Sequence, residues 1–182
     1  RQLLGIAIAI KASSPGPAFY AHRRIGKDGV HFNCYKFRSM AVDSDRRLQE
    51  YLRANPEAAK EWKETHKLKH DPRVTKIGAF LRKTSLDELP QLFNVIRGQM
   101  SLVGPRPIVD EEVIKYDVFF SDYTMVRPGM TGLWQTSGRS DTSYSRRVRL
   151  DAWYVRNWNI WLDISLLVKT VRVVLSSHSG AY

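Results

Sequence analysis

The chain has 182 residues, enough for a domain with its own hydrophobic core. Hydrophobic residues make up 43% and charged residues 26%, which excludes a disordered, collagen-like or coiled-coil chain. The single cysteine, Cys34, excludes an internal disulfide and a zinc site built from cysteines. The formal net charge is +11, with the excess in residues 1–40 and 72–109. Such an excess suits nucleic acid, an anionic membrane or a phosphorylated substrate, and composition does not choose among them.

An apolar run from Leu3 to Ile10 is interrupted only by Gly5 and is followed by the helix-breaking residues 13–17. The run is too short to span a bilayer. It is typical of the end of a longer hydrophobic helix, so we expect residues 1–12 to be the remnant of a membrane-inserted helix. A short core helix or a buried strand is the alternative.

Two strands are predicted at residues 19–25 and 30–37, joined by the turn residues 26–29. Alternation along the second strand places Lys36 and Arg38 on the same face. Two basic side chains on one face of a strand can contact an anionic ligand.

Residues 43–70 are helix formers of balanced charge, broken at Asn55–Pro56. We therefore predict two exposed helices that form an insertion with a scaffold role. His66 and His70 lie in this insertion, where solvent exposure is expected. The five histidines of the chain lack the spacing of a metal-ligand set.

The central run of residues 82–96 contains an adjacent pair of carboxylates, Asp87 and Glu88. One interpretation is structural, with two possible helix caps. Ser85 and Glu88 have the spacing of a capping box. Alternatively, Asp87 caps the helix, which would place Pro90 at the third helical position, where no backbone hydrogen-bond donor is missed. The other is chemical, because adjacent carboxylates can hold Mg²⁺ and an Asp can attack phosphorus. Both interpretations remain open from the residues alone.

Further along, Arg106 lies between two prolines, where stiff backbone would present its guanidinium to a phosphate. An exposed arginine in a rigid turn is the alternative. Pro128–Gly129 predicts a type II turn. Arg139 follows in the small-residue loop 135–140, which permits close approach of a ligand or is an ordinary loop.

Near the C-terminus, aromatic residues precede an apolar helix predicted at residues 158–175. Trp and Tyr at one end of such a helix are typical of the membrane interface. A buried core helix is the alternative. The aromatic residues are Trp153, Tyr154, Trp158 and Trp161.

Four blocks of the sequence, SPGPAFYAHRRIG, YKFRSM, RKTSLDELPQLFNVIRGQMSLVGPRP and RPGMTGLWQTSGR, together resemble the bacterial sugar transferases. These are the monotopic polyprenyl-phosphate hexose-1-phosphate transferases. The blocks occur in the order of the family and cover nearly the whole chain. The insertion and the C-terminal segment are most similar to members that transfer galactose 1-phosphate.

The resemblance implies an α+β fold, mainly helical with a small β-hairpin sheet. Residues 1–182 would form one membrane-associated, monotopic catalytic domain. Within it, 1–12 would be the remnant of a re-entrant membrane helix, 43–70 a helical insertion and 158–175 an interfacial helix.

The resemblance also implies the chemistry. Asp87 would attack the β-phosphate of a UDP-sugar, release UMP and hold the sugar phosphate until undecaprenyl phosphate accepts it. Glu88 would complete the catalytic pair, and both carboxylates would bind Mg²⁺. The residues expected to contact the substrate phosphates or the nucleotide are Lys36, Arg38, Arg82, Arg106 and Arg139.

The expected location is the cytoplasmic face of the inner membrane, in surface-polysaccharide synthesis such as that of O-antigen. The expected partners are the UDP-sugar, undecaprenyl phosphate and membrane lipids, with no nucleic acid. The resemblance to larger family members suggests a homodimer, but the sequence itself does not indicate an oligomeric state. Galactose is the expected sugar, and glucose or an N-acetylated sugar would use the same phosphate chemistry. Two other classes remain as alternatives. A basic nucleic-acid-binding module would show a salt-sensitive gel shift, and a membrane scaffold would keep its activities after Asp87→Asn.

Overall fold

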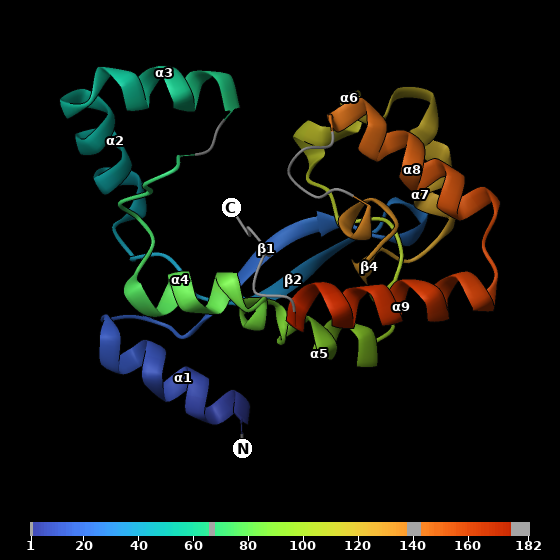
Figure 1. Cartoon of the computed structure of the whole chain (residues 1–182), viewed down its shortest axis with the longest axis horizontal. Helices are drawn as coiled ribbons and strands as arrows, with labels where there is room; N and C mark the ends of the chain where they lie inside the picture. Colours follow the sequence, from blue (N-terminus) through green and yellow to red (C-terminus); the bar gives the residue numbers. More distant parts are fainter. Residues whose placement is uncertain (1, 66–67, 138–142, 176–182) are drawn as a thin grey trace. The chain divides into compact units, whose positions relative to one another are not determined.

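The computed structural model describes residues 2–65, 68–137 and 143–175, and its elements are mostly helices, with four strands among the described residues (Figure 1). In chain order, with η for a 3₁₀ turn, they are α1 (Gln2–Ser13), β1 (Phe19–Ile25), η1 (Lys27–Gly29), β2 (His31–Phe37), α2 (Ser44–Ala54), α3 (Pro56–Thr65), α4 (Lys76–Lys83), η2 (Leu86–Glu88), α5 (Gln91–Ile96), β3 (Ser101–Val103), η3 (Asp110–Glu112), α6 (Val113–Tyr116), η4 (Asp117–Phe119), α7 (Phe120–Met125), β4 (Gly129–Thr131), η5 (Trp134–Thr136), α8 (Tyr144–Arg156) and α9 (Ile160–Leu175). The predicted mainly helical α+β class is confirmed.

The chain divides into two compact units. Among the described residues, the first unit contains those up to Tyr20 together with Phe37–Leu89, and the second contains Ala21–Lys36 together with those that follow Leu89.

In the first unit, α1 packs against α4 (Figure 1). Ile10 of α1 and Leu81 of α4 are buried together with Phe37, at the end of β2. The opposite side of α1 is open, since Leu4 and Ile8 are at least 60% exposed. The apolar run at the N-terminus is therefore a helix, with one side in the core of its unit and an apolar side exposed.

The insertion forms the two predicted helices, α2 and α3. Pro56 is the first residue of α3, a position where its fixed φ fits and no backbone donor is needed. Leu48 and Ala58 are buried in a small cluster of their own, and Trp62 packs against it. His70 is exposed as predicted, and His66 lies outside the described residues.

In the second unit, β1 and β2 pair as the predicted hairpin. The strand β2 begins at His31, one residue later than the sequence indicates. Asp28 (φ 56°) and Gly29 (φ 74°) supply the left-handed backbone that the turn requires. Ile25 donates its N–H to Ile108 O at 3.0 Å, which joins the hairpin to the segment before η3.

The short strands β3 and β4 pair in parallel, with Ser101 opposite Gly129 and Val103 opposite Thr131. The predicted type II turn at Pro128–Gly129 is wrong, because Gly129 has no positive φ and is the first residue of β4. A Cβ at Gly129 would lie 2.1 Å from Gly104 N, so glycine is needed for the close approach of the two strands.

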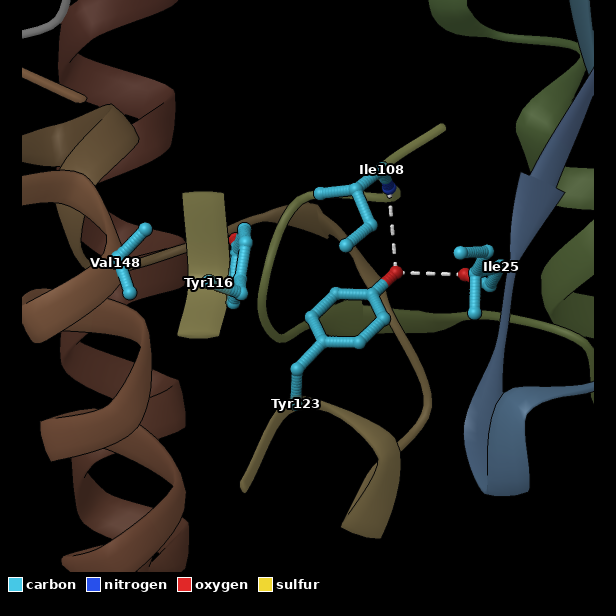
Figure 2. Close-up of a cluster of buried hydrophobic side chains, with 5 residues drawn as sticks. All are labelled: Ile25, Ile108, Tyr116, Tyr123 and Val148. Atoms are coloured by element: carbon cyan, nitrogen blue, oxygen red, sulfur yellow. Dashed lines mark hydrogen bonds between the residues drawn. The ribbon is translucent and has the colours of Figure 1, made fainter. Parts of the chain in front are cut away.

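The helical part of the second unit is built around Tyr123, a buried residue of α7 (Figure 2). Its hydroxyl donates to Ile25 O at 2.6 Å and accepts from Ile108 N at 3.3 Å. Tyr116 packs edge-on against its ring, and Val148 of α8 completes the cluster. One hydroxyl therefore joins α7, the hairpin and the segment before η3.

The predicted C-terminal helix is α9. Its inner side contributes Leu166, which is fully buried with Val103 and Tyr154. Its outer side exposes a row of apolar residues spaced three or four apart: Trp161, Ile164, Val168 and Val171. No helix among the described residues has the length and apolar character needed to cross a membrane.

Candidate active site

Asp87 lies in the first unit, in the 3₁₀ turn η2, and only 9% of its surface is exposed. Ser85 precedes the turn in the left-handed conformation (φ 57°) and makes no capping hydrogen bond. The helix α5 begins only at Gln91, after Pro90, and also lacks a side-chain cap. Both capping interpretations are therefore wrong. The turn holds the Asp87 carboxyl in a buried position next to the half-buried Glu88.

Arg82 is the basic residue that the structure brings to Asp87 within the first unit. It lies on the last turn of α4 and is partly buried. Burial lowers the pKa of its guanidinium, and the negative charges of Asp87 and Asp71 oppose that shift. Its Nε donates to Ser39 Oγ at 2.9 Å, which fixes the direction of the guanidinium plane. No described residue accepts a hydrogen bond from the two terminal nitrogens of Arg82, so they can face an anionic group.

The position of Ser39 depends on a close contact with α4. Thr75 caps α4, because its Oγ1 accepts from Gly78 N at 2.9 Å. The N–H of Thr75 donates to Ser39 O at 3.1 Å. A Cβ at Gly78 would lie 1.9 Å from that same oxygen, so any side chain there would displace Ser39 from Arg82.

Asp71 and Arg73 form a bidentate pair on the segment that leads into α4. Arg73 Nη2 lies 2.7 Å from Asp71 Oδ2, and Arg73 Nε lies 2.8 Å from Oδ1. Burial raises the pKa of the Asp71 carboxyl, but the hydrogen bonds from Arg73 outweigh this and hold that pKa below its ordinary value. The negative charge of Asp71 therefore raises the pKa of Arg82, although the carboxylate oxygens of Asp71 already accept hydrogen bonds from Arg73.

Arg38 was expected to contact the substrate, but its guanidinium binds backbone carbonyls of the protein instead. It is buried, and its terminal nitrogens donate to Pro15 O at 2.6 Å and Ser14 O at 2.8 Å. Its Nε has no partner among the described residues. In this conformation the guanidinium fixes the backbone that follows α1.

Two of the predicted basic residues belong to the second unit. Lys36 lies on β2 and is half-buried. Arg106 follows β3 and is partly buried between Pro105 and Pro107, which are both buried. Gly129 N donates to Pro105 O at 2.7 Å, so the β3–β4 pairing holds this segment. Arg139 lies outside the described residues.

Asn94 of α5 fixes the strand that carries Lys36. It is fully buried, and its Oδ1 accepts from Tyr35 N at 3.1 Å. Its Nδ2 donates to Asn33 O at 2.7 Å and to Gln99 Oε1 at 2.8 Å. Asn33 and Tyr35, which flank Cys34 just before Lys36, are thereby held to α5.

Sequence reasoning missed the supporting residues, namely Ser39, Asp71, Gly78, Arg73 and Asn94. Two of them, Ser39 and Asn94, lie within blocks that carry the family resemblance, but nothing in the spacing of those blocks indicated which partners they have. Asp71 and Arg73 lie just after the insertion, where no motif marks them as functional.

The carboxylates suit a magnesium ion held partly by substrate. The described residues contain no group of three or more His, Cys, Asp or Glu side chains that could form a protein cage for a metal. Adjacent Asp87 and Glu88 match the way Mg²⁺ is commonly bound, by one or two carboxylates together with substrate phosphates. The donor set therefore fits Mg²⁺.

A partly buried carboxyl pair and an arginine that interacts with it electrostatically are groups of the kind that can bind and act on phosphate. The family model described as bacterial sugar transferase matches residues 2–177. This chain belongs to that family.

The chain is similar to three longer proteins. It is 58% identical over 180 residues to an uncharacterized sugar transferase of Haemophilus influenzae, covering 99% of this chain and 38% of that protein. It is 57% identical over 167 residues to undecaprenyl-phosphate galactose phosphotransferase of Salmonella typhimurium, covering 92% and 35%. It is 55% identical over 179 residues to UDP-galactose-lipid carrier transferase of Erwinia amylovora, covering 98% and 37%. The chain thus spans little more than a third of the length of these relatives.

Proposed function

We propose that the chain is the catalytic domain of a phosphoglycosyl transferase, which moves a hexose 1-phosphate from a UDP-sugar to undecaprenyl phosphate and releases UMP. The observation that carries this proposal is the buried Asp87 beside Glu88, with Arg82 oriented by Ser39 in the same unit. The names of the relatives from Salmonella typhimurium and Erwinia amylovora support a lipid carrier as the acceptor.

The reaction would proceed in two displacements at one phosphorus atom. A carboxylate oxygen of Asp87 attacks the β-phosphorus, the bond from that phosphorus to the oxygen bridging to the α-phosphate breaks, and UMP leaves with the electron pair. An oxygen of undecaprenyl phosphate then attacks the same phosphorus. The bond to Asp87 breaks, which regenerates the carboxylate and leaves the sugar on a lipid diphosphate.

The basic residues would stabilise the negative charge of the transferred phosphoryl group. Arg82 suits this role because its two terminal nitrogens point away from the Ser39 contact with no described acceptor. Lys36 and Arg106 are proposed to contact the diphosphate or the nucleotide, as is Arg139. Arg38 has its terminal nitrogens on backbone carbonyls, so its proposed contribution is to hold residues 14–15.

Asp87 and Glu88 would hold Mg²⁺. When bound, the ion would neutralise charge on the diphosphate of the donor.

Galactose is the proposed sugar. Two relatives named for galactose are 55% and 57% identical to this chain and a third, a galactosyl transferase, is 45% identical, whereas relatives named for transfer of glucose 1-phosphate are 40% identical. Glucose is the alternative because it requires the same phosphate chemistry, and so does an N-acetylated sugar. The proposed location is the cytoplasmic face of the inner membrane, where an undecaprenyl lipid presents its phosphate.

The test is UMP release by the full-length protein in lipid particles, with UDP-galactose, undecaprenyl phosphate and Mg²⁺. We expect release by the wild type and its loss after EDTA or in Asp87→Asn. Asp45→Asn is the matched control, since Asp45 is an exposed carboxylate on α2. Without lipid acceptor, the wild type should exchange labelled UMP into UDP-galactose, as a covalent intermediate requires.

Wild-type turnover in Asp87→Asn would disprove the covalent mechanism. If no UDP-sugar in a panel with glucose and N-acetylated sugars released UMP, the transferase proposal itself would fail and the membrane scaffold would take its place.

A further inference from the structure

The insertion formed by α2 and α3 contacts the segment that leads into α4 through Trp62. This side chain is half-buried and packs against the small cluster that contains Leu48 and Ala58. Its ring also lies under Arg73, whose Cζ is 4.8 Å from the ring centroid. A guanidinium over an indole ring is attracted by the ring, and the attraction is stronger when the cation is shielded from water. The contact therefore joins the insertion to residues outside it.

Arg73 is held on a second side by Asp71. The two side chains form the bidentate pair described above, and they are only 14% and 12% exposed. Arg73 N also donates to Asp71 Oδ1 at 3.0 Å. The guanidinium thus lies between the ring of Trp62 and the carboxylate of Asp71, so loss of the ring would open one face of the pair to water.

The backbone around Arg73 is bonded to the residues around Ser39. Arg73 O accepts from Ala41 N at 2.8 Å, and Thr75 N donates to Ser39 O at 3.1 Å. An isolated antiparallel β-bridge lies between these two bonds. The position of Arg73 therefore bears directly on the position of Ser39.

These contacts end at the candidate active site. Ser39 Oγ accepts from Arg82 Nε at 2.9 Å, and Arg82 interacts electrostatically with Asp87. All of the residues in the sequence of contacts from Trp62 to Asp87 belong to the first unit. If Trp62 served only the core of the insertion, its loss would loosen α2 and α3 and leave residues 39–41 unchanged.

We propose that Trp62 is a positioning residue of the active site. By stacking on Arg73 it holds residues 73–75 against residues 39–41, and so keeps the Ser39 hydroxyl in place for Arg82. The insertion then has a part in catalysis beyond the scaffold role that the sequence predicts. This inference rests on the proposed function, in which Arg82 stabilises charge on the transferred phosphoryl group.

The first measurement is hydrogen exchange of the full-length protein in lipid particles, which does not depend on activity. The backbone donors to follow are Ala41 N–H and Thr75 N–H. In Trp62→Leu we expect at least fivefold faster exchange in peptides that cover residues 39–41 and 73–75. Tyr51→Leu is the matched control, because it removes a ring that packs against the same cluster but makes no contact with the guanidinium of Arg73 among the described residues. Its exchange in these peptides should stay within twofold of the wild type.

The second measurement is steady-state kinetics of UMP release. Trp62→Leu should lower kcat about fivefold and leave KM for the UDP-sugar within twofold, because a displaced arginine loses its effect on the charge that develops during the reaction. Trp62→Phe keeps an aromatic face and should retain at least half of the wild-type kcat, and Tyr51→Leu should remain within twofold of it. In a Ser39→Ala background, Trp62→Leu should have little further effect, since both changes act through the same hydroxyl.

Unchanged exchange in Trp62→Leu, or an equal rise in Tyr51→Leu, would overturn the proposal. Faster exchange with an unchanged kcat would do the same, as would a full additional loss of kcat in the Ser39→Ala background. If the wild type released no UMP, the proposed function would fail, while hydrogen exchange would still decide whether Trp62 holds the segment that contains Ser39.

Folding of each variant is checked by thermal unfolding. If Trp62→Leu does not fold, Trp62→Met decides by the same criteria, since the flexible methionine side chain fills irregular space in a core but offers no aromatic face to Arg73.

Discussion

A single hydroxyl, that of Ser39, orients the guanidinium of Arg82, which interacts electrostatically with Asp87. Ser39→Ala removes the acceptor for Arg82 Nε while the charge of Arg82 remains. We expect kcat for UMP release to fall about tenfold, with a smaller change in KM, because an arginine that stabilises developing charge must be fixed in place beforehand. The measurement is steady-state kinetics of UMP release.

Ser13→Ala is the control for this change, since the Ser13 hydroxyl makes only a local bond to Ile10 O. Ser39→Thr keeps the hydroxyl and should retain more activity than Ser39→Ala. Equal kcat values for wild type and Ser39→Ala would show that Arg82 needs no positioning by Ser39.

The residue scale is also where sequence reasoning failed most. Ser85 and Glu88 have the spacing of a capping box. In the structure Ser85 has left-handed backbone and makes no capping hydrogen bond, and it is followed by the 3₁₀ turn η2 rather than directly by the helix α5. Ser39 is 43 residues from Arg82, so no local pattern reveals their contact. Asp87 itself was identified, because an adjacent pair of carboxylates in a basic stretch is visible in the sequence.

At the scale of elements, local signals predicted much of the fold. The hairpin follows from its turn residues, and the two helices of the insertion follow from Pro56, because both depend on backbone preferences of a few residues. The β3–β4 pair was missed. Its strands have three residues each and pair in parallel across a long stretch of chain, so their pairing depends on tertiary packing.

Among the elements, α9 carries a row of exposed apolar residues that includes Trp161 and Val168. An apolar helix face binds a bilayer surface in proportion to the apolar area it buries. We expect Trp161→Glu combined with Val168→Glu to lower binding of the chain to vesicles at least tenfold in a flotation assay. The two substitutions remove apolar area and place charges against the acyl region.

Ser121→Glu is the control, because it adds a charge at an exposed position of α7. If the α9 variant floated as the wild type does, the face would have another use, such as contact with a protein.

At the scale of the whole molecule, stability depends on pH through groups that titrate in opposite directions. Burial lowers the pKa of His22, which favours the folded state as pH rises through 6.5. Pairing with Arg73 holds the pKa of Asp71 below its ordinary value of 3.8, although burial opposes this shift. The resulting contribution to the stability of the folded state is present above pH 3.8 and is lost only as the pH falls below that value.

Asp151 acts in the opposite sense to His22 over the same pH range. Burial raises its pKa from 3.8 to about 7, so between these values the folded protein binds a proton that the unfolded chain does not. Stability from this group is therefore present below pH 4 and is lost as pH rises to 7, by up to roughly 4 kcal/mol. Tyr116 donates to its Oδ2 at 2.8 Å in either state of the carboxyl.

The difference between wild type and Asp151→Asn isolates this contribution, because His22 and Asp71 are common to both proteins. Asn cannot ionise, yet it retains an oxygen that accepts from Tyr116. We expect the stability of Asp151→Asn relative to wild type to rise from pH 4 to pH 7 and to level off above pH 7, as measured by thermal unfolding. A difference that stayed constant over that range would mean that burial does not raise the pKa of Asp151 and that its carboxyl is already ionised in the folded protein.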